Sequence, residues 1–180
     1  MDKIYVAALN EEVVGLDYFH VLGVGKINAT LKTIELINKF NPNEVINFGT
    51  AGTLNKNLNG IIECTKFYQR DMDCRGLLDF KLGEKPFDRV NEIVISENGY
   101  SCGTGDNFVT KKIEMDLDVV DMEAYAIAKV CFIKKVNFRC FKFISDNADN
   151  SADNDWNTNL KIAATKFEEF RLANLVWLMI

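Results

Sequence analysis

The chain has 180 residues, of which 48% are hydrophobic and 26% charged, and this composition is ordinary for a soluble globular protein. A formal net charge of −5 argues against a nucleic-acid-binding surface, because phosphate backbones are bound by clustered Lys and Arg. Five Cys without CxxC spacing and one His, His20 in an apolar run, argue against a zinc site or a His-based catalytic triad.

The first third of the chain alternates short apolar runs with polar turns. Ile4 to Leu9 predicts a buried strand that ends in the acidic turn Asn10-Glu11-Glu12. A strand over Tyr18 to Leu22 leads through Gly23-Val24-Gly25-Lys26 into a helix from about Ile27 to Phe40. The expected inward face of this helix has three- to four-residue spacing and consists of Ile27, Leu31, Ile34, Ile37 and Phe40.

The rest of the chain continues this alternation. Strands are expected over Glu44 to Phe48, Ile61 to Tyr68, Glu92 to Ile95, Ser101 to Cys102, Asp118 to Asp121 and Phe138 to Ser145, with a loop over Gly76 to Phe87. A helix over Glu123 to Lys134 should turn four residues inward: Ala126, Ile127, Val130 and Cys131. A last helix, capped by Asp153 or Asp155, should extend as far as Ile180 with an apolar stripe of Leu160, Ala163, Ala164, Phe167, Phe170, Leu175 and Leu178.

Strands that alternate with helices predict a largely parallel twisted sheet with helices on both faces, a three-layer α/β/α architecture. We expect one domain over residues 1–180. No signal peptide or membrane span is recognisable, so we expect a cytoplasmic protein without a membrane partner.

Gly23-Val24-Gly25-Lys26 invites a phosphate-loop interpretation that its neighbours contradict. The Walker pattern needs Gly six residues before its Lys, where His20 stands, and Ser or Thr after it, where Ile27 stands. The dinucleotide fingerprint needs a third Gly where Asn28 stands. This segment is therefore interpreted as a tight turn into a helix.

The stretch from Phe141 to Asp149 is the strongest candidate for chemistry. It begins as a buried strand and ends in Ser145-Asp146-Asn147-Ala148-Asp149. Ligands of open α/β sheets bind beyond the carboxyl ends of the strands, where Asp146 would reach a crevice. Taken alone, the stretch favours the simpler interpretation that Ser145 and Asp146 only cap the turn that leaves the strand.

Five stretches, in this order, resemble the purine nucleoside phosphorylase and nucleosidase superfamily and are most similar to its methylthioadenosine/S-adenosylhomocysteine nucleosidases. They are Ala7 to Val13, Asn47 to Gly52, Gly105 to Val109, Val120 to Ala124 and Ile144 to Asp149. The resemblance covers the chain from end to end, and it implies a mixed, largely parallel central sheet. It also implies cleavage of the bond between a purine and its sugar, with no cofactor and no metal.

The resemblance implies two catalytic carboxyl groups. Asp146 would protonate N7 of the departing purine, held by Ser145, and must therefore carry a proton near neutral pH. Glu12 would deprotonate a water that attacks C1′ from the other face of the sugar. Glu12 is preferred to its neighbour Glu11 because the acid of the family lies just before the apolar residue, here Val13.

The remaining implied site residues bind the nucleoside. Glu123 would accept hydrogen bonds from ribose hydroxyls, with Met122 packed on the sugar and Asp121 beside it. Thr50, on a loop flanked by Gly52, would lie near the water and the ribose. Phe108 would stack on the base, the Val109 backbone would read its edge, and Trp156 would cover it. The alternative for Phe108, Met122 and Trp156 is an ordinary core position.

Water is favoured over phosphate as the acceptor. Phosphorylases of this superfamily place Arg just before the Gly-Thr loop, where this chain has Asn47, and no Arg follows Glu12 before Arg70. Without a bidentate cation, phosphate loses its main anchor. A phosphorylase and a shortened relative that binds nucleosides without turnover remain the alternatives.

The chain also departs from the nucleosidase pattern. Only ten residues separate Glu12 from Gly23, so an early hairpin is missing. Lys142 replaces a common Arg, Asp121 replaces a Glu, and Gln69-Arg70-Asp71 replaces a His-Asp version. These changes leave the 5′ substituent of the substrate undetermined. Because the family is usually dimeric, we expect a homodimer.

Overall fold

The computed structural model describes residues 2–77 and 79–173. Within them the strands are β1 Lys3–Ala7, β2 Phe19–Val21, β3 Glu44–Thr53, β4 Ile61–Gln69, β5 Glu92–Val94, β6 Tyr100–Thr104, β7 Val119–Asp121 and β8 Asn137–Asp146. The helices are α1 Lys26–Phe40, α2 Ala124–Lys134 and α3 Ala152–Ala173, and a short 3₁₀ helix covers Asn10–Glu12. None of these helices is long and apolar enough to cross a membrane.

All of the strands belong to one mixed sheet. Their order is β2-β1-β3-β7-β6-β4-β5, and β8 pairs with both β3 and β4. β1 is parallel to β2 and β3, β3 is parallel to β8, and β6 is parallel to β4 and β7. The pairs β3 with β7, β4 with β5 and β4 with β8 are antiparallel. Because β1, β3 and β8 run in one direction, their carboxyl ends meet at the same edge of the sheet.

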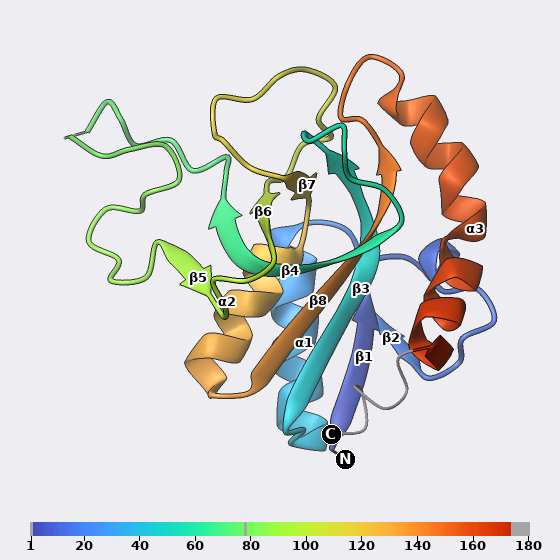
Figure 1. Cartoon of the computed structure of the whole chain (residues 1–180). Coiled ribbons are helices and arrows are strands. Elements are labelled where there is room, and N and C mark those ends of the chain that lie inside the picture. The colour runs from blue at the N-terminus through green and yellow to red at the C-terminus, as the bar shows by residue number, and fades with distance from the viewer. Residues whose placement is uncertain (1, 78, 174–180) are drawn as a thin grey trace.

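Helices cover both faces of this sheet. Figure 1 shows α1 and α2 together on one face and α3 on the opposite face. The predicted three-layer α/β/α architecture with a mixed, largely parallel sheet is therefore confirmed. In the same view the described residues between β4 and β5 extend away from the sheet, and no helix or strand is found among them.

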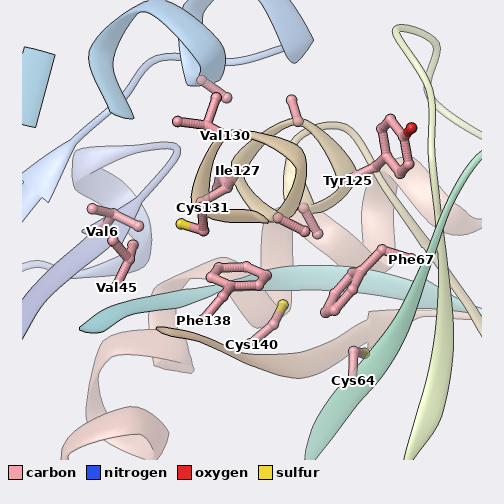
Figure 2. Packing of buried hydrophobic residues seen from close by; sticks show 14 of the residues in the cluster. Val6, Val45, Cys64, Phe67, Tyr125, Ile127, Val130, Cys131, Phe138 and Cys140 are labelled. Carbon is pink, nitrogen blue, oxygen red and sulfur yellow. The ribbon is translucent and has the colours of Figure 1, made fainter. Parts of the chain in front are cut away.

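The larger core cluster lies between α2 and the sheet. Figure 2 shows Ile127 and Cys131 of α2 next to Phe138 and Cys140 of β8, with Phe67 of β4 alongside. The four residues of α2 that were expected to point inward are all buried. This packing fixes the start of α2, and the loop before it, against the carboxyl end of the sheet.

Three expectations about individual elements were wrong. In α1, Ile27 and Leu31 are 72% and 63% exposed, because the buried face is rotated from the expected stripe and consists of Ala29, Thr33, Leu36 and Ile37, of which only Ile37 was expected. β3 continues five residues beyond Phe48, because Gly49 to Thr53 pair with β8 and β7. α3 begins at Ala152, so neither Asp153 nor Asp155 is its cap, and the expected extension to Ile180 with Leu175 and Leu178 lies outside the described residues.

A β-bulge interrupts the pairing of β3 with β8 at the edge of the sheet. Ala51 is paired with Ile144, but Gly52 is paired with Asp146, so Ser145 is an additional residue on β8. A bulge of this kind redirects the side chain that follows it. Here the redirected side chain is that of Asp146.

Candidate active site

A cavity of about 340 Å³ lies at the carboxyl ends of β3 and β8. This volume lies in the range of pockets that hold small ligands. Its wall includes all eleven residues named as candidates from the sequence: Glu12, Thr50, Gly52, Phe108, Val109, Asp121, Met122, Glu123, Ser145, Asp146 and Trp156. The structure therefore brings together segments that are up to 144 residues apart in the chain, from Glu12 to Trp156.

Asp146 ends β8 and lies directly against Gly52 of β3. Its Oδ2 accepts a hydrogen bond from Ser145 Oγ at 2.7 Å, and its Oδ1 accepts one from the Ala148 N–H at 2.8 Å. Burial raises the pKa of Asp146 above its usual value, although the hydrogen bonds from Ser145 and Ala148 act in the opposite direction. A buried carboxyl group with a raised pKa is suited to donate a proton.

Glu12 enters the cavity from the 3₁₀ helix after β1. The residue is 3% exposed, whereas its neighbour Glu11 is exposed, as expected from the sequence. Its Oε2 accepts hydrogen bonds from the backbone N–H groups of Ala8 and Leu9, at 3.2 and 3.1 Å. Its Oε1 accepts from the N–H and the Oγ1 of Thr50, at 2.8 and 2.9 Å. These donors from two strand ends hold the carboxylate in one orientation.

Glu123 is the third carboxyl group of the cavity. It precedes α2, and its Oε1 accepts a hydrogen bond from the Gly25 N–H at 2.8 Å. Burial raises the pKa of Glu123 to about 8, and the negative charge of Asp121 adds to the increase. Glu123 therefore carries a proton over much of the neutral range.

Two aromatic side chains line another part of the wall. Phe108 is 45% exposed, and its ring centroid lies 6.3 Å from that of Trp156 with the planes at 71°. Trp156 also donates a hydrogen bond from Nε1 to Thr50 Oγ1 at 3.0 Å. Val109 is buried beside Phe108, and Met122 is half-buried next to Glu123. Phe108 and Trp156 therefore face the cavity.

Arg70 lines the cavity and was not among the residues expected there. All three of its guanidinium nitrogens donate to protein acceptors: Nε to Gly103 O, Nη1 to Asn107 Oδ1, and Nη2 to the carbonyls of Gly105 and Asn107. The available signal was its place in the polar cluster that ends β4, the same kind of signal that identified Asp146.

A group of charges connects three segments next to the cavity-lining residues Val24, Arg70 and Asn107. Lys26 Nζ forms an ion pair with Asp71 and lies 3.3 Å from Asp106 Oδ2. The Asp106 N–H donates to Asp71 Oδ2 at 2.9 Å, and the Lys26 N–H donates to Asp106 Oδ1 at 2.8 Å. Gly25, whose N–H binds Glu123, adjoins this group, so these contacts also position the Glu123 carboxyl.

No cluster of three or more His, Cys, Asp or Glu residues able to bind a metal occurs in residues 2–77 and 79–173. The chemistry available in the cavity is that of a buried acid, a hydrogen-bonded carboxylate and aromatic faces. Such a set can transfer protons to and from a flat, polar ligand.

Comparison with known proteins gives concordant matches. The model of the phosphorylase superfamily matches residues 88–178. The 5′-methylthioadenosine/S-adenosylhomocysteine nucleosidase of Buchnera aphidicola subsp. Schizaphis graminum is 32% identical over 91% of this chain and 79% of its own length. The enzyme of the same name from Bacillus velezensis is 31% identical over 83% and 76%.

Two solved structures show the same fold over almost the whole chain. A futalosine hydrolase of Helicobacter pylori superposes with a TM-score of 0.86 at 25% identity and covers 97% of both chains. A mutant methylthioadenosine nucleosidase of the same species, with 5′-methylthioadenosine in its active site, gives 0.87 at 23% identity and the same coverage.

Proposed function

The chain belongs to the phosphorylase superfamily, among the relatives of the methylthioadenosine/S-adenosylhomocysteine nucleosidases, and we propose that it hydrolyses the N-glycosidic bond of an adenine nucleoside. 5′-Methylthioadenosine and S-adenosylhomocysteine are the substrates that these names suggest. The products would be adenine and the free sugar. One observation carries the proposal: Glu12 and Asp146 face one cavity from the two sides of the end of β3.

The end of β3 determines the distance between the carboxyl groups of Glu12 and Asp146. Thr50 binds Glu12, and a Cβ on Gly52 would lie only 2.6 Å from Asp146 Oδ1. Residues two apart on a strand are separated by about 6.6 Å. Glycosidases that activate water directly keep their carboxyl groups about 6.5–9.5 Å apart, which leaves room for a sugar carbon and a water.

In the proposed reaction, Asp146 donates its proton to N7 of adenine as the bond to C1′ lengthens. The raised pKa of Asp146 supports this role, because the group must hold a proton at neutral pH. Glu12 accepts a proton from the water that attacks C1′. Its carboxylate form satisfies the N–H and O–H donors around it.

The other residues of the cavity would bind the substrate. Glu123 would bind ribose hydroxyls, and Met122 would pack against the sugar. The exposed face of Phe108 would stack on adenine, with Trp156 as its cover, and the backbone of Val109 would read the edge of the base. Their placement on one cavity wall supports these assignments.

Water is the acceptor that the cavity favours over phosphate. Among the described residues that line it, Arg70 is the only cation, and its three nitrogens are bonded to protein oxygens. The side chain of Asn47 is buried and donates to the carbonyls of Val6 and Phe48. A cation free to form a bidentate contact is a common anchor for phosphate in such sites, and this wall offers none among its described residues.

The test is chromatography of the products from 5′-methylthioadenosine, S-adenosylhomocysteine, adenosine and futalosine, with and without phosphate. We expect adenine and free sugar from at least one adenine nucleoside in phosphate-free buffer. Asp146→Asn should lower kcat by roughly 10²–10⁴-fold. Release that requires phosphate would identify a phosphorylase. Saturable binding without release would identify a non-catalytic relative.

We also propose a homodimer. Ile27, Leu31 and Ile133 are 63–72% exposed and lie together beside a hollow between α1 and α2. Ile27 is three residues from Val24, which lines the active-site cavity, so this apolar face adjoins the site. Contiguous exposed apolar surface commonly marks a protein interface.

Sedimentation velocity tests the dimer. Leu31→Arg should shift the protein to a monomer, and Leu172→Arg, a matched change at an exposed Leu on α3, should not. A monomeric wild-type protein at micromolar concentration would refute this assembly.

A further inference from the structure

Trp156 is linked to Glu12 by two consecutive hydrogen bonds. The indole Nε1–H donates to Thr50 Oγ1 at 3.0 Å, and the same oxygen donates its proton to Glu12 Oε1 at 2.9 Å. The three residues come from α3, β3 and the 3₁₀ helix, respectively. Side chains that are 144 residues apart, at positions 12 and 156, thus form one connected path along the cavity wall.

The direction of this path is fixed by the chemistry of its members. An indole N–H can only donate, and a hydroxyl has a single proton to give. When Oγ1 accepts from Trp156, its proton is left to point at the other partner, Glu12 Oε1. The indole therefore determines which way the Thr50 hydroxyl is turned.

We propose that Trp156 is a positioning residue for Glu12, and this proposal rests on the function proposed above. Its indole N–H holds the Thr50 hydroxyl as a donor to the carboxylate, so that the base keeps one orientation toward the attacking water. A Phe at this position would cover the cavity equally well but could not orient Thr50. The donor atom, and not only the aromatic surface, is thus the functional feature of Trp156.

The contact has a consequence for substrate binding. The same indole faces Phe108 across the wall, with ring centroids 6.3 Å apart. A ligand stacked on Phe108 would lie next to the ring that orients Thr50, so Trp156 borders both the site for adenine and the general base.

A double-mutant cycle tests this role. Trp156→Phe keeps the ring and removes the donor, so it should lower kcat by roughly threefold to tenfold, the size of one hydrogen bond, and leave KM nearly unchanged. Thr50→Val should also lower kcat. Because the indole acts only through the hydroxyl, Trp156→Phe should cause no further loss in the Thr50→Val background.

Two kinetic results would overturn the proposal. One is an equal loss from Trp156→Phe in both backgrounds. The other is a rise in KM alone, which would make Trp156 only a cover for the base. Trp156→Ala removes both functions and should change kcat and KM together.

A spectroscopic readout keeps this test separate from the proposed function. The chain has two Trp, so ¹⁵N-labelled protein gives two indole N–H signals, and Trp156→Phe identifies the one of interest. The chemical shift of that signal should change in Thr50→Val and also in Glu12→Gln, although Glu12 is two hydrogen bonds away from the indole. An indole signal that is unchanged in both variants refutes the link, even if the wild-type protein releases no base.

Discussion

The ammonium group of Lys142 lies 2.8 Å from Asp121 Oδ2, and the two side chains are 2% and 1% exposed. Burial lowers the pKa of Lys142, but the Asp121 carboxylate outweighs it and the pKa is raised, so the lysine is charged. Asp121 also accepts hydrogen bonds from Thr104 Oγ1 at 2.5 Å and from the Ala124 N–H at 2.8 Å. The pair therefore ties β8 to β6, to β7 and to the start of α2.

Loss of Lys142 should be costly for stability. Lys142→Met leaves Asp121 as an uncompensated buried charge, which typically lowers the free energy of unfolding by about 3–5 kcal/mol. Lys142→Arg keeps the charge and serves as the control. Urea unfolding followed by circular dichroism measures both, and a Lys142→Met protein as stable as wild type would contradict the importance of this pair.

The hydrogen bond from Ser145 should influence the pH at which Asp146 loses its proton. The Ser145 hydroxyl donates to the ionised form of Asp146, so Ser145→Ala removes a hydrogen bond that lowers the pKa of Asp146. Asp146 then keeps its proton to higher pH. The basic limb of the kcat/KM profile should move upward by roughly half to one pH unit. A downward shift of that limb would argue against Asp146 as the proton donor.

Gly52→Ala should block the acid through a steric contact. Gly52 is not in the left-handed region, so Ala fits its backbone, but the added Cβ would lie 2.6 Å from Asp146 Oδ1. The displaced carboxyl group of Asp146 should no longer reach the purine ring of the substrate, and we expect a decrease in kcat of about 10²-fold or more. Gly76→Ala, where a Cβ meets nothing within 4 Å, is the matched control and should retain full activity.

Glu123 should make the protein less stable at alkaline pH. Its pKa is about 8 in the folded state against an ordinary value of 4.5, so between these values the folded chain holds a proton that the unfolded chain has released. Stability therefore decreases as pH rises through this range, by on the order of 3 kcal/mol between pH 6 and 8.5. Glu123→Gln cannot ionise and should flatten the dependence. Urea unfolding at pH 6 and 8.5 compares the two proteins, and equal slopes would contradict the raised pKa.

The contents of the cavity were predicted mainly from the five stretches that resemble the nucleosidases, and the position of Asp146 also from its place at the end of a strand. Asp146 and Thr50 were expected at the carboxyl ends of parallel strands, and such ends meet whatever the details of packing. The inward face of α2 was also predictable, because Ala126, Ile127, Val130 and Cys131 recur at helical spacing and all four are buried.

The predictions that failed concern features that depend on contacts between segments far apart in the chain. The face of α1 could not be read from spacing alone, since Ile27 and Leu31 fit a helical stripe as well as the residues that are buried. The extension of β3 depends on its pairing with β7 and β8. Arg70 carried a usable signal, but its partners at Gly103 to Asn107 became visible only in the structure.

The additional residue in β8 has a consequence for how this site can be lost. Ser145 and Asp146 together lie opposite the single residue Gly52, so β8 bends at the point where it reaches the cavity. Deleting Ser145 would let Ile144 and the acid follow the regular pleat of β3, and it would remove the hydroxyl that binds the carboxyl group. The length of β8, and not only its composition, therefore decides how the acid enters the site.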